Sequence, residues 1–177
     1  MTIGIDIDNT ITNTSSLANL LANNIKKCNN YYDLEKEDLT LFLSKYLEYI
    51  TYNVTLKDNV INVLKKWYKK GYKIIFITAR GTEKVDDYTN LKVICLTSLY
   101  FKKMHIPFNE IVFFKNNKAL TAQKYNLDVF IDDKEKVLDE INASGINTIR
   151  FTNCESKHKT VNSWLDIDKI IEEMGDL

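Results

Sequence analysis

The first residues of the chain alternate between apolar and polar side chains. Residues 3–8 read IGIDID, with an isoleucine at every second position. This period of two predicts a β-strand, in which residues two apart project from the same face. Asp6 and Asp8 therefore point the same way near the end of the strand, and Asn9-Thr10 predicts a turn directly after it.

The next stretch, residues 12–56, carries apolar residues at helical spacing. Apolar positions recur three or four residues apart in 13–25 and again in 34–50, which predicts two amphipathic helices. A third run of this kind covers 57–70 and ends before Gly71, a residue type that commonly follows a helix.

Beyond Gly71, short apolar runs alternate with helical patterns. Such alternation predicts a parallel sheet with helices on both faces. The helical stretch 12–56 then forms a small cap over the carboxyl edge of the sheet, where open α/β folds place their ligands. We expect a core of residues 1–11 and 57–177, with the cap 12–56 inserted after the first strand. The expected strands are 3–7, 72–77, 111–114, 129–131 and 146–151, and the later helices are 86–104, 119–125, 135–143 and 161–174.

Length and charge narrow the class of protein. A chain of 177 residues suits one core with a small appended cap. Its formal net charge is zero, from 24 basic and 24 acidic residues, which argues against nucleic acid as a partner. No apolar run reaches membrane-spanning length. The three cysteines lack metal-ligand spacing and are typical of reduced thiols, so we expect a cytoplasmic protein without a membrane partner.

Asp6 and Asp8 are the first residues that suggest chemistry. Two carboxylates this close repel each other and raise each other's pKa. A hard cation such as Mg²⁺, which prefers oxygen ligands, would relieve the repulsion and leave one carboxylate free to act as a nucleophile. The alternative is structural: Asp6 opens a turn and Asp8-Asn9-Thr10 caps the next helix.

The second expected strand ends in Thr78-Ala79-Arg80-Gly81. A hydroxyl group followed by free backbone N–H groups at a strand end makes an anion site. Thr78 is equally suited to a turn or a helix cap. Arg80 is as compatible with a surface salt bridge as with a contact to substrate.

Two further motifs follow the third and fourth expected strands. Lys118 opens a short helix, where its ammonium group would stabilise a carboxylate and phosphoryl oxygens; Lys115 is a competing candidate. Asp132 and Asp133 come directly after a buried strand, a costly position for two carboxylates without a cation. We therefore expect one of this pair to share a metal with Asp6 and the other to orient the groups around it.

These four motifs, in this order, resemble the haloacid dehalogenase superfamily. Its phosphatases carry D-x-D-x-[TV] after the first strand, Thr or Ser after the second, a Lys, and a late acidic pair. Here the motifs are Asp6-Ile7-Asp8-Asn9-Thr10, Thr78, Lys118 and Asp132-Asp133. The resemblance spans residue 1 to about 150 and implies an α/β fold, a Rossmann-like three-layer parallel sheet with a small helical cap.

Within that superfamily the chain resembles the 5′(3′)-deoxyribonucleotidase type and its bacterial relatives. The features that carry this similarity are residues 4–11, 77–80, 130–133 and 162–165. The resemblance implies a Mg²⁺-dependent hydrolase of phosphoric monoesters, with a nucleoside monophosphate or deoxymonophosphate as its substrate. A leaving-group acid at Asp8 also favours cleavage of a phosphate ester over cleavage of a carbon–halogen bond.

The resemblance further implies a role for each carboxylate. Asp6 attacks phosphorus and forms an aspartyl-phosphate, and Asp8 protonates the leaving alcohol and then deprotonates the attacking water. Mg²⁺ is held by Asp6, by the main-chain carbonyl of Asp8 and by Asp132. Asp133 supports these groups without binding the metal itself.

Phosphate binding is implied for the residues at the other two motifs. The Thr78 hydroxyl, the Ala79 N–H and the Lys118 ammonium hold the phosphoryl oxygens. Arg80 joins them as a further candidate for phosphate binding.

The choice of substrate is expected to lie with the aromatic residues of the cap. Tyr31 and Tyr32 are the favoured contacts for a nucleobase, whereas Phe42 and Tyr46 suit packing within the cap. The alternatives are a sugar phosphate or another small ester, a phosphoprotein, a polynucleotide 3′ end, or binding without catalysis. The sequence leaves the oligomeric state open, a homodimer included.

Overall fold

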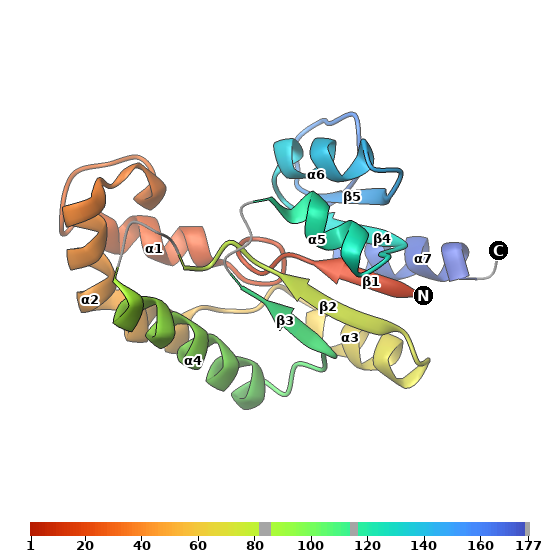
Figure 1. Ribbon diagram of the computed structural model, residues 1–177, viewed down its shortest axis with the longest axis horizontal. Coiled ribbons are helices and arrows are strands. Elements are labelled where there is room, and N and C mark those ends of the chain that lie inside the picture. The colour runs from red at the N-terminus through yellow and green to blue at the C-terminus, as the bar shows by residue number, and fades with distance from the viewer. Residues whose placement is uncertain (82–85, 114–116, 176–177) are drawn as a thin grey trace.

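The computed structural model describes residues 1–81, 86–113 and 117–175. In this part of the chain six parallel strands form one sheet, in the order β3-β2-β1-β4-β5-β6 (Figure 1). Because β1 lies in the middle of the sheet, the loop after it reaches the centre of the carboxyl edge. The strands are β1 (Thr2–Ile5), β2 (Lys73–Ile77), β3 (Glu110–Val112), β4 (Val129–Asp132), β5 (Asn147–Phe151) and β6 (Lys159–Val161).

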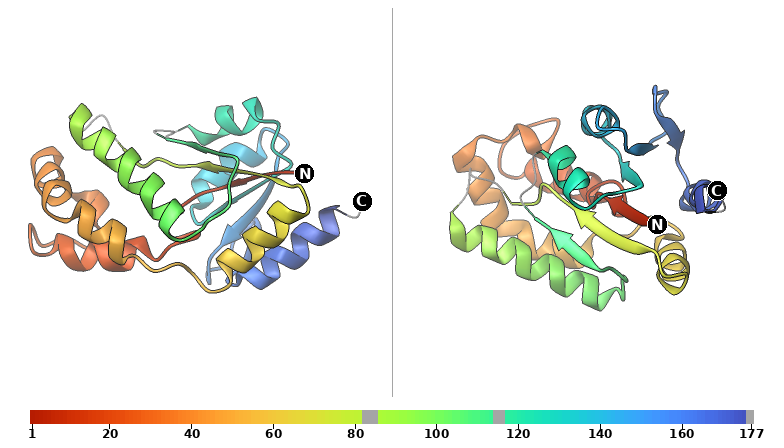
Figure 2. Two further views of the ribbon diagram at one scale, coloured as in Figure 1. Left: turned by 90° about the horizontal axis from the view of Figure 1, so that it is seen from below. Right: turned by 45° about the vertical axis from the view of Figure 1, so that its right-hand side comes forward.

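Helices cover both faces of the sheet, which gives three layers (Figures 1 and 2). One apolar cluster joins β1 to α3 (Val60–Lys69), α4 (Asp87–Lys103) and α7 (Trp164–Gly175). On the other face a second cluster joins the sheet to α5 (Lys118–Lys124) and α6 (Glu135–Asn142). The parallel three-layer α/β fold predicted from the sequence is confirmed.

The cap consists of α1 (Thr14–Ala22), a short 3₁₀-helix η1 (Tyr31–Asp33) and α2 (Lys36–Asn53). It has an apolar cluster of its own, separate from those of the sheet and centred on Ala18, Ala22, Leu34, Phe42 and Ile50. Its two connections to the core run side by side, because Thr12 and Leu56 form an antiparallel bridge. The Asn13 N–H also donates to the Thr55 carbonyl, at 2.9 Å. These pairings lie at the predicted ends of the insertion, although the division into two domains stays a prediction.

The sequence prediction is wrong at the far edge of the sheet. Residues 159–161 form β6, and the last helix begins at Trp164 instead of residue 161. Residues 159–161 read Lys-Thr-Val and lack the apolar run that predicts the equally short edge strand β3, so the helical pattern of the last segment extends over Val161. His158, which directly precedes β6, is buried and bonds to Thr148 at 2.8 Å and to Asp139 at 2.7 Å.

Gly4 lets β1 lie closely beside β4. A Cβ atom at this position would lie 2.3 Å from a Leu127 methyl carbon and 2.4 Å from a ring carbon of Phe130. Both neighbours are buried, so neither ring nor methyl group has free space to move into.

We therefore expect Gly4→Ala to lower the free energy of unfolding by about 1–3 kcal/mol, the range for overpacking a core. Urea unfolding followed by circular dichroism measures the effect, with Ser16→Ala at an exposed cap position as the control. A Gly4→Ala protein as stable as the wild type would show that β1 and β4 can separate at no cost.

Candidate active site

Three of the predicted site residues meet at the carboxyl edge of the sheet. Asp6 directly follows β1, Asp132 ends the neighbouring strand β4, and Lys118 opens α5. The Lys118 ammonium lies 2.5 Å from Asp6 Oδ1 and 2.7 Å from Asp132 Oδ2. All three side chains are buried, so a single cation bridges two carboxylates away from solvent.

The remaining carboxylate oxygens of this pair are also held. Thr10 Oγ1 donates to Asp6 Oδ2 at 3.2 Å, and the Lys134 N–H donates to Asp132 Oδ1 at 2.8 Å. The loop that carries Thr10 is itself fixed, because the indole N–H of Trp164 donates to the Thr10 carbonyl at 3.1 Å. The orientation of Asp6 is thus set by α7 as well as by α5.

The acidic residues here are costly to ionise together. Burial raises the pKa of Asp6, and the Asp132 and Asp8 carboxylates raise it further, against the lowering effect of Lys118. Burial likewise raises the pKa of Asp132. The pKa of Asp133 is raised to about 6, by burial and then by the negative charge of Asp6. An added cation would favour the ionised form of each group.

The carboxylates fit a hard divalent metal ion. Asp6, Asp132 and Asp133 each offer one oxygen, and these oxygens lie within 4.8 Å of one another. Asp133 Oδ1 is buried, yet no described residue gives it a hydrogen bond. Carboxylate oxygens are the ligands that Mg²⁺ and Ca²⁺ prefer, and an unbonded buried oxygen favours such an ion. The family resemblance implied only a supporting role for Asp133, whereas its position makes it a candidate ligand.

The Asp8 carboxylate belongs to a different group of residues. Arg80 Nη2 donates to Asp8 Oδ1 at 2.7 Å, and Arg80 Nε donates to Asp8 Oδ2 at 3.0 Å. Burial alone would raise the pKa of Asp8, but the Arg80 guanidinium lowers it below its usual value. Any contribution of Asp8 to a metal site would therefore come through its main-chain carbonyl.

Arg80 is itself held by the core helix α4. Its Nη1 donates to Thr97 Oγ1 at 3.0 Å. The sequence is compatible with a salt bridge of Arg80 on the surface. The salt bridge that Arg80 forms with Asp8 is instead largely buried on both sides. Sequence reasoning missed the partnership with Asp8 and the part of Thr97, and no spacing in the chain indicates either contact.

The anion-binding motif after β2 adopts a tight turn. Thr78 is buried, and its Oγ1 accepts a hydrogen bond from the Arg80 N–H at 3.1 Å. Ala79, Arg80 and Gly81 line the cavity above Asp6, whereas Thr78 is not among its lining residues. Lys115, the alternative to Lys118, lies outside the described residues.

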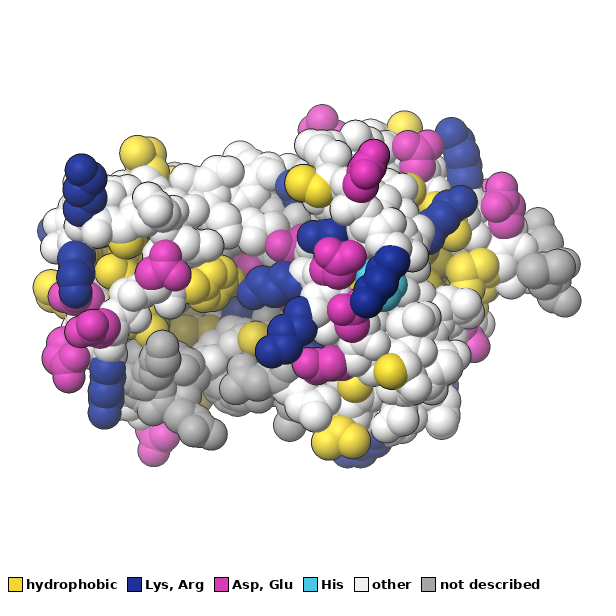
Figure 3. Space-filling view, turned by 90° about the horizontal axis from the view of Figure 1, so that it is seen from above, with side chains coloured by type: hydrophobic (Ala, Val, Ile, Leu, Met, Phe, Trp, Pro, Cys, Tyr) yellow, Lys and Arg dark blue, Asp and Glu magenta, His cyan; other side chains and the backbone are white. Residues whose placement is uncertain are grey.

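A cavity of about 420 Å³ lies between the cap and the edge of the sheet. Asp6, Asp8, Arg80 and Lys118 form its polar end. Apolar cap residues form the opposite wall, which includes Leu39, Phe42, Leu43, Leu47 and Ile50. Figure 3 shows the molecule hollowed between cap and core, with apolar side chains on the cap side and charged ones on the core side.

Tyr31 and Tyr32, the first two residues of η1, both line this cavity. Their ring centroids are 4.0 Å apart, and the Lys134 ammonium lies 4.5 Å from the centre of the Tyr32 ring. Phe42 is buried and packs against Tyr46 as expected, and it also forms part of the cavity wall. Tyr49 and Tyr52 are exposed and are absent from the lining.

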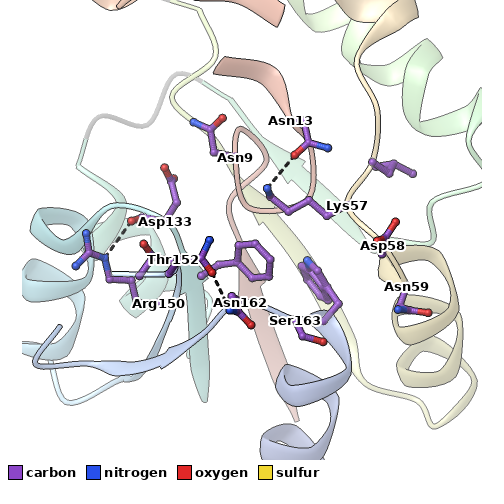
Figure 4. Close-up of a pocket in the computed structure, with 14 residues that line it drawn as sticks. Asn9, Asn13, Lys57, Asp58, Asn59, Asp133, Arg150, Thr152, Asn162 and Ser163 are labelled. Carbon is purple, nitrogen blue, oxygen red and sulfur yellow. Dashed lines mark hydrogen bonds between the residues drawn. The ribbon is translucent and has the colours of Figure 1, made fainter. Parts of the chain in front are cut away.

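A second, more open cavity of about 750 Å³ adjoins the loop between β1 and α1 (Figure 4). Asn9 and Asn13 line it from the loop, and Lys57 and Arg150 line it from the core. Asp133 lies at its edge, where the Arg150 Nε donates to the Asp133 carbonyl at 3.2 Å. Asp133 therefore borders the open cavity, while Asp6 borders the cavity beneath the cap.

The sequence and the fold were compared with those of known proteins. No family model matches the sequence. The chain is 27% identical over 143 residues to "Putative nucleotidase BH1399" of Halalkalibacterium halodurans, a match that covers 74% of this chain and 68% of that protein. Within the described residues no helix is long and apolar enough to cross a membrane.

Solved structures share the fold at low sequence identity. One is the haloacid dehalogenase-like hydrolase SP0104 of Streptococcus pneumoniae, with a TM-score of 0.65 and 15% identity, covering 96% of this chain and 97% of that one. Another is a haloacid dehalogenase superfamily hydrolase of Ehrlichia chaffeensis, with a TM-score of 0.61 and 14% identity, covering 98% and 96%. The fold that the four motifs imply is confirmed, because the chain shares the fold of these haloacid dehalogenase-like hydrolases.

Proposed function

We propose that the protein is a metal-dependent phosphatase that hydrolyses nucleoside monophosphates, deoxymonophosphates included, through an aspartyl-phosphate. The observation that carries the proposal is the buried Asp6 carboxylate, which faces the cavity beneath the cap and contacts Lys118. A phosphate ester is favoured because the nucleophile Asp6 and the cation of Lys118 lie at one end of that cavity, and the other candidate metal ligands, Asp132 and Asp133, lie beside Asp6.

Asp6 would attack phosphorus with one carboxylate oxygen while Lys118 and Thr10 hold the side chain in place. The Lys118 ammonium would also donate to a phosphoryl oxygen as negative charge develops there. Asp6, Asp132, Asp133 and the Asp8 carbonyl are the groups that would hold Mg²⁺, which supplies positive charge to the nucleophile and the phosphoryl group.

Asp8 would transfer the protons of both half-reactions. Its ionised form, which Arg80 favours, would take a proton from the water that attacks the aspartyl-phosphate, and the resulting acid would give that proton to the leaving alcohol oxygen in the next turnover. Arg80 holds this carboxylate through hydrogen bonds and also lines the cavity beneath the cap. A substrate phosphoryl group at this wall would thus meet the guanidinium and the acid together, which retains Arg80 as a candidate phosphate contact. The Thr78 hydroxyl and the Ala79 N–H complete the proposed phosphate site.

The apolar side of the cavity favours a nucleoside as the leaving group. Leu39, Leu43 and Leu47 would contact a base or deoxyribose, and the Tyr31-Tyr32 pair offers an aromatic surface at the rim. The similarity to a protein named as a nucleotidase points the same way. A sugar phosphate would place its hydroxyl groups against this apolar wall. A polynucleotide or a phosphoprotein would have to reach a site that lies beneath the cap.

The proposed location is the cytoplasm. Among the described residues Cys28, Cys95 and Cys154 are free thiols. Free thiols are typical of proteins in reducing compartments.

Phosphate release from dUMP, dTMP, UMP, GMP, glucose 6-phosphate and p-nitrophenyl phosphate tests the proposed function. We expect turnover of nucleotides in Mg²⁺, its loss in EDTA, and a fall of at least about 10³-fold in Asp6→Asn, as for removal of a nucleophile. Asp166→Asn, at an exposed position of α7, is the matched control. Hydrolysis confined to glucose 6-phosphate would overturn the nucleotidase assignment, and an active Asp6→Asn enzyme would overturn the mechanism.

The metal site can be tested without activity. We expect Asp132→Asn and Asp133→Asn each to weaken Mn²⁺ binding by about 10–100-fold, because each removes a charged oxygen from a site of three carboxylates. Electron paramagnetic resonance of free Mn²⁺ measures the dissociation constant, with Asp166→Asn again as the control. Unchanged Mn²⁺ affinity in Asp133→Asn would return that residue to the supporting role expected from the sequence.

The Arg80–Asp8 pair predicts a dependence on the leaving group. Arg80→Gln should misplace the Asp8 acid, lowering kcat by about 10²-fold for nucleotides, whose alkoxide leaves poorly without a proton. The loss for p-nitrophenyl phosphate should be smaller, because nitrophenolate needs little protonation. Asp8→Asn should show the same pattern, and Thr97→Val a weaker version of it. Equal losses on both substrates would show that Arg80 serves phosphate binding instead.

A further inference from the structure

Helix α4 carries large apolar residues on two opposite sides, one facing the core and one facing outward. One side packs into the core through Val93, Leu96, Tyr100 and Phe101. The opposite side carries Tyr88, Leu91, Cys95 and Leu99, all of them exposed: Tyr88 by 74%, Leu91 by 58% and Leu99 by 51%. An exposed row of large apolar residues opposite the buried side of a helix is a second surface suited to burial.

The exposed residues form a single stripe. Their spacings of three, four and four residues align Tyr88, Leu91, Cys95 and Leu99 along one face of the helix. Figures 1 and 2 show α4 on the outside of the molecule, beside the edge strand β3. Large apolar side chains gathered on an outer surface indicate a protein contact, whereas isolated ones do not.

The charges on α4 indicate which partner fits. Asp86 and Asp87 lie at its amino end, and Lys102 and Lys103 lie at its carboxyl end. When two copies of α4 pack antiparallel, Tyr88 of one copy lies opposite Leu99 of the other, and Leu91 lies opposite Cys95. The same alignment brings Asp87 of one copy to within about one helical turn of Lys102 of the other, at both ends. The stripe is thus complementary to itself in shape and in charge.

We propose that the protein forms a symmetric dimer by antiparallel packing of the α4 stripe against the same stripe of a second copy. This inference is independent of the proposed function, because the stripe lies on the side of α4 that faces away from Thr97 and the active site. From Tyr88 to Leu99 the stripe is about 17 Å long at the rise of an α-helix. One such contact is smaller than a standard interface, so we expect dissociation in the micromolar range.

Sedimentation equilibrium over a concentration series tests the dimer. The wild-type protein should approach twice the chain mass of 20.6 kDa at high concentration. Leu91→Asp and Leu99→Asp should each raise the dissociation constant by at least about tenfold, because each introduces a charge into an apolar contact. Leu165→Asp, at an exposed apolar position of α7, is the matched control and should leave the constant unchanged. A protein that stays monomeric, or a dimer that tolerates Leu91→Asp, would overturn the proposal.

Crosslinking gives a second readout on the unmodified protein. Cys95 lies close to the twofold axis of the proposed dimer, so a short bismaleimide should join Cys95 to Cys95 of the second copy. Cys154, which is exposed but distant in the sequence from α4, is the internal control in the same sample. Peptide mapping that finds Cys154–Cys154 links in place of Cys95–Cys95 links would contradict the α4 interface.

Discussion

The ammonium group of Lys118, shared between Asp6 and Asp132, is the interaction on which the rest of the site depends. Two carboxylates on adjacent central strands cannot both stay ionised in a buried position unless a cation lies between them. Lys118 supplies that cation from the first turn of α5, a helix that reaches the site only because β3 and β4 direct the chain to the same edge of the sheet. The parallel sheet therefore determines which charged side chains meet at its carboxyl edge.

The charges around this centre indicate what else it needs. Asp6, Asp8, Asp132 and Asp133 bring four carboxylates, whereas Lys118 and Arg80 bring two cations, each already bonded to a carboxylate. When all four carboxylates are ionised, this set of six side chains is left with two negative charges. A divalent ion beside Asp133 would balance them and would give its unbonded buried oxygen a partner.

Much of this arrangement could be predicted from the sequence, for a physical reason. Asp6, Lys118 and Asp132 follow or precede apolar runs, and parallel strands bring such positions to one edge whatever the details of packing. The bond between Arg80 and Asp8 and the part played by Thr97 depend on how α4 lies against β2, which no local pattern encodes. The prediction of β6 failed because Lys-Thr-Val lacks the apolar run by which the equally short β3 is recognised. The burial of His158 depends on Asp139 and Thr148 from two other elements.

The separate apolar cluster of the cap has a consequence for how proteins of this design diverge. Ala18, Leu34 and Ile50 belong to this cluster, whereas the cap meets the core through its two paired connections and where α2 packs against α4, with an ion pair between Glu48 and Lys92. Substitutions distant from one another usually have additive effects on stability. The residues of the cap cluster that shape the cavity wall can therefore be exchanged with little effect on Asp6, Lys118 and Asp132, which are held by the sheet and α5. Selection can act on the choice of substrate and on the chemistry as two nearly independent traits.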